Sequence, residues 1–232
     1  MKATAPWIIA VTALSFAGSL RAATITLVAT DSNSISQYQP MDRGDNLLAV
    51  GFFIIGWVGY IKFDLSVIPD SAEITGLTLT AYNDTTYSMG STTDPTITVF
   101  RSSVDTWSRA VTNDPFPGVA EQLSSPLTSF PSAPGAAISW ILDVNAFDYE
   151  TDLADNVFSV GLKQTNPAVP DRYMNFSGVN NPLSLPGPPA PSQYTPRLEV
   201  TYNTGISEPS SALLLLSATS LWSLRRRKPA IC

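Results

Sequence analysis

Short runs of alternating hydrophobic and polar residues recur through the middle of the chain, from Thr24 to Asn203. In each run the hydrophobic side chains occupy every second position, which is the period of a β-strand with one buried face. Threonine, valine and aromatic residues, which favour strands, are frequent in these runs. The runs lie at 24–27, 60–65, 77–82, 96–99, 138–144, 158–162, 174–176 and 198–202. The pattern predicts an all-β domain.

Clusters of turn-forming residues separate the runs, for example at 83–84, 90–95 and 180–182. Outside the two ends, only Val144 to Ala154 has a pattern that suits a helix. The proline-rich stretch from Pro182 to Pro196 predicts an extended surface loop before the last strand. Many short strands joined by loops predict a jelly-roll-like β-sandwich.

The run at 60–65 also predicts which side chains are buried. Phe63 and Leu65 should face the core, while Asp64 should face the solvent. Asp64 is then placed to accept backbone N–H groups at the turn before Pro69, which ends the strand because proline has no N–H to donate.

Residues 1–22 have the three parts of a secretory signal peptide. Lys2 supplies a positive charge, an apolar run extends from Pro6 to Gly18, and small residues follow at Ala22 and Ala23. Cleavage after Ala22, after Ala23 or earlier after Ala17 stays open, and an uncleaved membrane anchor is the alternative. We therefore expect a signal helix and export.

Residues 205–232 divide into a polar motif, an apolar run and a cluster of positive charge. The motif is Glu208-Pro209-Ser210, the apolar run extends from Ala212 to Leu224, and the cluster is Arg225, Arg226, Arg227 and Lys228. A helix over the apolar run is roughly 20 Å long, whereas the core of a bilayer is about 30 Å thick. The run therefore holds a membrane only marginally, with the basic cluster on the cytoplasmic side.

This tail resembles the PEP-CTERM sorting signal of bacterial surface proteins. Glu208, Pro209 and Ser210 match its motif, and Ser207 stands where the first proline is usual. The resemblance implies that an exosortase in the inner membrane cuts near the motif and passes the protein outward. The C-terminal helix would then be a transient inner-membrane anchor, and a plain tail anchor is the alternative.

The middle of the chain is acidic. Between Ala22 and Thr204 it has seven Lys or Arg and 18 Asp or Glu residues, a net charge of −11. This charge repels phosphate backbones and argues against nucleic acid as a partner. The chain has no histidine, and its single cysteine is Cys232, so intrachain disulfides, His/Cys metal sites and histidine-based catalytic triads are excluded.

Four phrases in the middle resemble, in order, the DNRLRE-type domain of secreted bacterial proteins, which is related to carbohydrate-binding modules. The phrases are YIKFDLSVIPDSAEITGLTLTAYN at 60–83, VFRSSVDTWSRAVTND at 99–114, SWILDVN at 139–145 and TPRLEVTY at 195–202. Asn145 stands where the family has threonine. The resemblance implies a β-sandwich module that is non-catalytic or binds sugar.

Exposed aromatic rings are the candidates for carbohydrate contact, because a ring face can pack on a sugar while a polar tip stays wet. Tyr60, Tyr82 and Trp107 are the candidate contacts, whereas Trp57 and Trp140 are predicted to lie in the core. Packing inside the sandwich is the alternative for all of them, and Trp107 in particular is placed to plug its edge.

An acidic run contains the only candidate cation ligands. It comprises Asp143, Asp148, Glu150, Asp152 and Asp155. Carboxylate oxygens suit calcium, but the spacing is not that of an EF-hand loop. We predict a solvated acidic turn and no cofactor, with calcium as the alternative. A pair of glycosidase carboxylates is a further alternative.

The sequence thus predicts a signal peptide at 1–22, a DNRLRE-like β-sandwich at 23–204 and a PEP-CTERM-like sorting tail at 205–232. We expect an exported, non-enzymatic protein of the cell surface or extracellular matrix, associated with exopolysaccharide or another carbohydrate. A polysaccharide-active enzyme is one alternative. A purely structural envelope component that assembles through edge strands is the other.

Overall fold

The computed structural model describes residues 21–36, 47–53, 55–88, 95–107, 118–131, 133–166, 172–179 and 193–204. Almost all regular structure in these ranges is strand. The strands are β1 (Arg21–Val28), β2 (Asp31–Ser36), β3 (Leu47–Phe53), β4 (Ile55–Asp64), β5 (Glu73–Ser88), β6 (Ile97–Ser102), β7 (Val119–Gln122), β8 (Ala137–Leu142), β9 (Val157–Gln164), β10 (Arg172–Ser177) and β11 (Arg197–Thr204). The predicted all-β class is confirmed.

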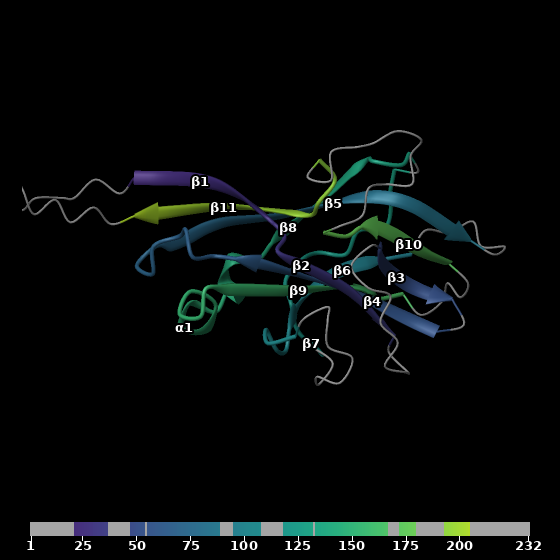
Figure 1. Ribbon diagram of the computed structural model, residues 1–232, viewed down its shortest axis with the longest axis horizontal. Coiled ribbons are helices and arrows are strands. Elements are labelled where there is room, and N and C mark those ends of the chain that lie inside the picture. The colour runs from purple at the N-terminus through teal and green to yellow at the C-terminus, as the bar shows by residue number, and fades with distance from the viewer. Residues whose placement is uncertain are drawn as a thin grey trace, which may run out of the picture. The chain divides into compact units, whose positions relative to one another are not determined.

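The long strand β5 joins two layers of antiparallel strands (Figure 1). Its first part, 73–82, pairs with β11 on one side and β8 on the other, and its last part, 83–88, pairs with β10. We call β1, β11, the first part of β5 and β8 layer A. The remaining strands, β2, β3, β4, β6, β7, β9 and β10, form layer B. One continuous sheet thus folds over into a sandwich-like arrangement.

The core lies between the two layers. Its largest fully buried side chains include Trp140 from layer A and Phe63, Phe158 and Phe176 from layer B. The alternation at 60–65 is confirmed, because Phe63 and Leu65 are buried while Asp64 is exposed. The buried hydrophobic residues of the described ranges all lie between Leu27 and Val200, and 22–204 forms a compact unit of its own. This span therefore carries a complete core.

The turn after β4 forms as its sequence predicts. The Asp64 carboxylate accepts a hydrogen bond from the backbone N–H of Ser66, at 2.8 Å. Because this bond favours the ionised form, the pKa of Asp64 lies below its usual value.

Three strands lack the alternation of hydrophobic and polar residues and were not predicted from the sequence. The strand β2 illustrates the reason. It reads Asp-Ser-Asn-Ser-Ile-Ser, which resembles a turn, yet Ser32, Asn33 and Ser34 are all buried. The hydroxyl of Ser34 accepts the backbone N–H of Ala49 at 2.6 Å, so the layer itself supplies the polar partner that burial requires. The other two strands without the signal are β3 and β7.

The stretch from Val144 to Ala154 holds only short helical turns. A 3₁₀ turn covers Val144–Ala146, and the helix α1 covers Tyr149–Asp152. The Asp143 carboxylate caps the first of these by accepting the N–H of Asn145 at 2.9 Å. Within the described ranges, no helix has the length and apolar character of a membrane span.

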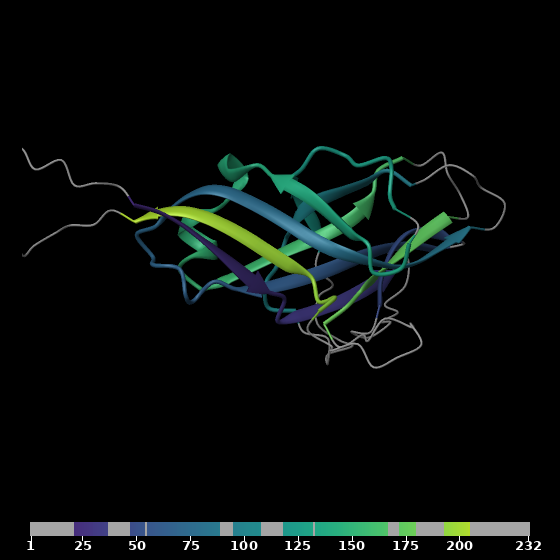
Figure 2. The same ribbon diagram turned by 90° about the horizontal axis from the view of Figure 1, so that it is seen from above.

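The two ends of the domain lie together. Thr24 bonds Thr201 through their hydroxyls at 3.1 Å, and the N–H of Ala29 bonds the carbonyl of Pro196 at 2.9 Å. These contacts make β1 and β11 antiparallel, so that the start of β1 and the end of β11 come to the same end of the sandwich (Figure 2). The sorting motif Glu208-Pro209-Ser210, the basic cluster 225–228 and nearly all of the signal segment lie outside the described residues.

Candidate functional site

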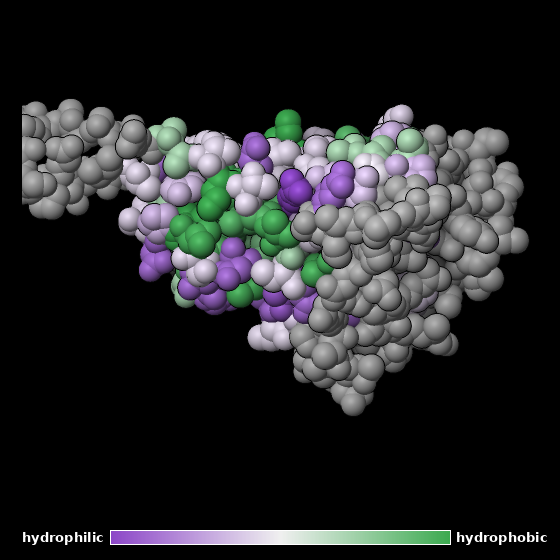
Figure 3. All heavy atoms as spheres, turned by 45° about the horizontal axis from the view of Figure 1, so that its top comes forward, coloured by the Kyte–Doolittle hydropathy of each residue, from purple (hydrophilic) through white to green (hydrophobic). Residues whose placement is uncertain are grey.

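The outer face of layer A carries rows of hydroxyl groups. On β5 the buried residues Leu77, Leu79 and Ala81 alternate with the outward residues Thr78 and Thr80, and a partly exposed Tyr82 follows. Thr80 lies between Ser139 of β8 and Arg197 of β11, and its hydroxyl bonds that of Ser139 at 2.9 Å. Figure 3, which turns this side forward, shows hydrophobic residues among the polar ones in the half away from the grey residues.

An aromatic pair stands beside these rows. The rings of Tyr82 and Tyr194 meet edge to face, with centroids 5.7 Å apart and planes at 75°. Both side chains are partly exposed. Tyr82 is placed by the alternation of β5, and Tyr194 by the short segment that leads into β11. The contact fixes the orientation of both rings without burying them.

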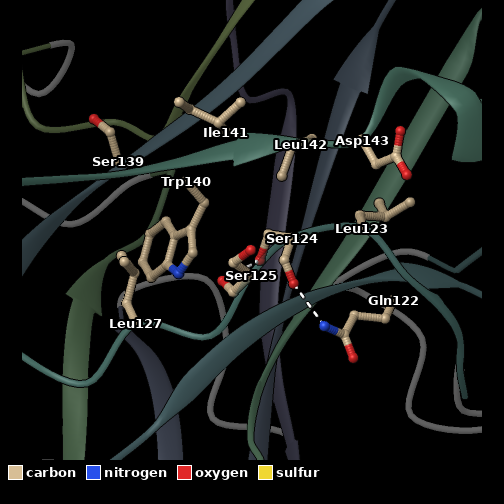
Figure 4. Close-up of a pocket in the computed structure, with 10 residues that line it drawn as sticks. All are labelled: Gln122, Leu123, Ser124, Ser125, Leu127, Ser139, Trp140, Ile141, Leu142 and Asp143. Atoms are coloured by element: carbon tan, nitrogen blue, oxygen red, sulfur yellow. Dashed lines mark hydrogen bonds between the residues drawn. The ribbon is translucent and has the colours of Figure 1, made fainter.

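A depression of about 690 Å³ runs along β8 (Figure 4). Ser124, Ser125, Ser139, Ile141 and Asp143 are among the residues that line it. The side chains of Ser139 and Ile141 point to the opposite side of β8 from Trp140 (Figure 4). Ile141 is 81 % exposed, the most of any large hydrophobic residue among those described. Ser139 belongs both to the depression and to the hydroxyl row, so the two features adjoin.

The wall of the depression is held by hydrogen bonds of the segment 123–127, which closes the gap between the two layers. Leu127 exchanges two backbone bonds with Ile97 of β6, both at 2.9 Å. At the other side, Asp143 N–H donates to the carbonyl of Leu123 at 2.6 Å. The Gln122 side-chain amide donates to the carbonyl of Ser124 at 2.8 Å (Figure 4). The hydroxyl-bearing wall is therefore a fixed surface.

The outer face of layer B is different, because a second apolar cluster covers it. Tyr60 and Trp107 pack with ring centroids 6.1 Å apart, and Ile35 and Val58 join them. Tyr60 is 4 % exposed and Trp107 is 3 % exposed. Burial raises the pKa of Tyr60 to about 12, since the charged form loses its water. These two predicted contact residues thus present no free ring face to a sugar.

Trp107 is the plug of this cluster, over layer B. The ammonium of Lys62 lies 4.5 Å from the centre of its ring and donates a hydrogen bond to its backbone carbonyl. Burial lowers the pKa of Lys62, although Asp31 and Asp105 act in the opposite direction. Of the remaining tryptophans singled out in the sequence, Trp57 and Trp140 are buried, as predicted.

The predicted solvated acidic turn is wrong at one position. Asp152 is fully buried, and both guanidinium nitrogens of Arg101 donate to it, at 2.7 and 2.5 Å. The N–H of Asp148 also donates to Asp152, at 3.1 Å. Burial raises the pKa of Asp152 to about 6, against the opposing effect of Arg101. No local sequence pattern indicates this pair, because Arg101 is far from Asp152 along the chain.

Two other acidic residues of the run lie in separate turns, and the side chain of Glu150 lies outside the described residues. Asp143 and Asp155 are exposed, and their carboxylates accept N–H groups of nearby residues, Asn145 and Val157. Among the residues that the structure describes, no three acidic or cysteine side chains are grouped to hold a metal ion. The lining of the depression contributes one carboxylate, Asp143, rather than the facing pair that glycoside hydrolysis uses.

Tyr194 and the segment 123–127 are the parts of this site that sequence reasoning missed. Tyr194 follows a proline-rich stretch, and a tyrosine directly before a closing strand is its only signal. No known family model matches the sequence, and no curated protein shows significant similarity to it. The resemblances to PEP-CTERM signals and DNRLRE-type domains therefore stay predictions.

Proposed function

We propose that this protein is an exported, non-enzymatic component of the bacterial cell surface or extracellular matrix, and that its layer A face binds carbohydrate. The observation that carries the proposal is the Tyr82–Tyr194 pair beside the Thr80–Ser139 hydroxyls and the depression along β8. A partly exposed ring packs on the apolar face of a sugar, and hydroxyls both donate to and accept from sugar hydroxyls. The neutral character of this row suits an uncharged polysaccharide better than an anionic one, given the −11 charge of the domain.

The finer fold assignment belongs to the same proposal. A jelly-roll-like sandwich of the DNRLRE type fits the two antiparallel layers, with a signal helix before it and a sorting helix after it. The single carboxylate of the depression favours binding over catalysis, so the enzyme alternative is the weaker one. No cofactor is proposed, and calcium remains the alternative for the acidic run.

A binding experiment tests the face. Residues 21–204 would be passed over immobilised neutral and acidic polysaccharides, including the exopolysaccharide of the producing cells, with and without calcium. Retention on a neutral polysaccharide should fall roughly tenfold in Tyr82→Ala or Tyr194→Ala, about 1.4 kcal/mol of binding free energy. Val67→Ala is the control, because Val67 is exposed but lies in the turn after β4. Retention that is equal in all variants, or absent throughout, contradicts the proposal.

The sorting route is the second part of the proposal. An exosortase would cut near Glu208-Pro209 after the apolar run and the cluster Arg225–Lys228 have held the chain in the inner membrane for a time. The antiparallel pairing of β1 with β11 supports it, because the signal segment and the tail then leave the domain at one end. Mass spectrometry of the exported protein should find both ends trimmed. An exported chain that retains 225–232 rules this route out.

A further inference from the structure

The strand β1 is an edge of layer A, at the end of its strand order. Its backbone pairs with β11 on one side, and among the described residues no other strand pairs with it. Figures 1 and 2 show it at the margin of the layer. An edge strand offers a row of N–H and C=O groups to any second strand, and proteins usually block such edges with charges, proline or short strands.

Among the described residues, the edges at β7 and β2 are blocked, and the edge at β8 is covered at its end. β7 has four residues, carries Glu121, and makes only two register pairs with β6. The end of β8 is covered by the segment 123–127 through the N–H of Asp143. β2 is buried along Ser32–Ser36, and its serine hydroxyls bond Ala49 and Val179. The edges at β7 and β2 thus have a physical reason not to pair with another molecule, whereas β8 is covered only at Leu142 and Asp143.

After Arg21 at its start, β1 has none of these devices. From Ala22 to Val28 it reads Ala-Ala-Thr-Ile-Thr-Leu-Val, without charge or proline. Val28 is 47 % exposed, and Ala22, Thr24 and Thr26 also face the solvent. Every signal cleavage site that the sequence leaves open keeps Thr24 to Val28 in the mature chain, so the edge persists after export.

Charge identifies the partner that fits this edge. Two copies of a domain with a net charge of −11 repel each other over most of their surfaces. The neutral residues of β1 allow two copies to meet without opposing carboxylates. The nearest charged residues of the adjoining strand, Arg197 and Glu199 of β11, are of opposite sign.

We propose that β1 pairs antiparallel with β1 of a second copy of this chain, so that layer A continues from one copy into the other. A register centred on Ile25 opposes Thr24 to Thr26, a pair that suits adjacent strands. The contact is the same on both copies, as a two-fold dimer requires.

The antiparallel pairing determines whether the dimer suits the membrane-held or the released form of the protein. Because the strands are antiparallel, the Thr204 end of one copy lies at the opposite end of the joined sheet from that of the other. Two copies whose tails sit in one membrane present these ends in the same direction. The dimer therefore suits the released domain, which is the form to test, and this last step rests on the sorting route proposed above.

Sedimentation equilibrium of residues 21–204, without any polysaccharide, tests the pairing separately from carbohydrate binding. A few strand pairs bury little area, so we expect a monomer–dimer equilibrium with a dissociation constant on the order of 0.1 mM. The double variant Thr24→Lys/Thr26→Lys places like charges across the two-fold axis and should weaken the dimer at least roughly tenfold, or about 1.4 kcal/mol. Both side chains point outward, so the core is unchanged, while the hydroxyl bond of Thr24 to Thr201 is lost. Thr201→Ala removes the same bond without adding charge and should leave the dimer unchanged.

Thr78→Lys is the matched control, because Thr78 lies on the same face but on the central strand β5. It should leave the dimer unchanged. A protein that is monomeric at every concentration overturns the proposal, as does a dimer that the β1 variant leaves intact or that both variants weaken equally. Hydrogen exchange gives a second measurement, in which protection should rise with concentration along 22–28 and stay constant along β7.

Discussion

Both layers contain strands of alternating residues, but the outward-facing residues are exposed in layer A and buried in layer B. In layer A the outward residues of β5, Thr78, Thr80 and Tyr82, meet solvent. In layer B the outward residues of β4, Val58 and Tyr60, lie under Trp107 in a second apolar cluster. Period-two alternation identifies one buried face of a strand, but it does not say whether the other face is wet. Only the packing of a distant segment decides which aromatic rings can reach a ligand.

The largest expected effect separates Trp107 from Tyr82. Trp107→Ala removes a buried ring and should cost about 3–5 kcal/mol of unfolding free energy. Tyr82→Ala removes a partly exposed ring and should cost about 1 kcal/mol or less. Chemical denaturation of both variants measures the difference. Equal losses would mean that the two faces are not distinct.

Buried and exposed carboxylates should change the stability of the domain with pH in different ways. The pKa of Asp152 is raised from 3.8 to about 6, so the folded chain holds this proton more tightly than the unfolded chain. Its contribution to stability is therefore greatest below about pH 4 and falls as pH rises to about 6, by roughly 1–3 kcal/mol. Asp152→Asn should remove this fall in denaturation curves measured across the range.

Asp64 should behave in the opposite way. Its pKa is lowered by the hydrogen bond from Ser66, so its contribution is present at neutral pH and is lost as the solution becomes acidic. Asp64→Asn should flatten only the acidic limb of the stability profile. If both variants change the same limb, the assignment of buried and exposed carboxylates is wrong.

A smaller effect concerns the closeness of packing in the two layers. A Cβ atom at Gly161 of β9 would lie 2.9 Å from Val119 and 3.2 Å from Tyr60. Gly161→Ala should thus cost about 1–3 kcal/mol. Gly76→Ala in layer A meets only Thr201, at 3.3 Å, and should cost less. Thermal unfolding of the two variants gives the order, and a larger loss for Gly76→Ala contradicts it.

The smallest effect is expected at the hydroxyl row. Thr80→Ala removes an exposed bond to Ser139 and should change stability by no more than about 0.5 kcal/mol. If layer A binds carbohydrate as proposed, the variant should nevertheless weaken polysaccharide retention, because it removes a hydroxyl of the proposed binding face. A large loss of stability would assign Thr80 to the fold rather than to binding.

Much of the fold was predictable, because hydrophobic alternation marks most strands and fixes Phe63, Leu65 and Trp140 in the core. The strand β2 was not predictable, because the hydrogen-bond partner of its buried Ser34, the N–H of Ala49, lies on another strand. Of the three predicted contact residues, Tyr82 alone has a partly exposed ring. Tyr60 and Trp107 failed as contacts because each is the other's packing partner, from segments far apart in the chain.

The most direct test of the central claim is to map a carbohydrate onto isotopically labelled residues 21–204 by the chemical-shift changes of its backbone amides. An oligosaccharide from the exopolysaccharide of the producing cells is the ligand. Binding at the proposed face predicts that the largest changes fall at Thr80, Tyr82, Ser139 and Tyr194. Changes that gather on layer B, or no changes at saturating oligosaccharide, would contradict it.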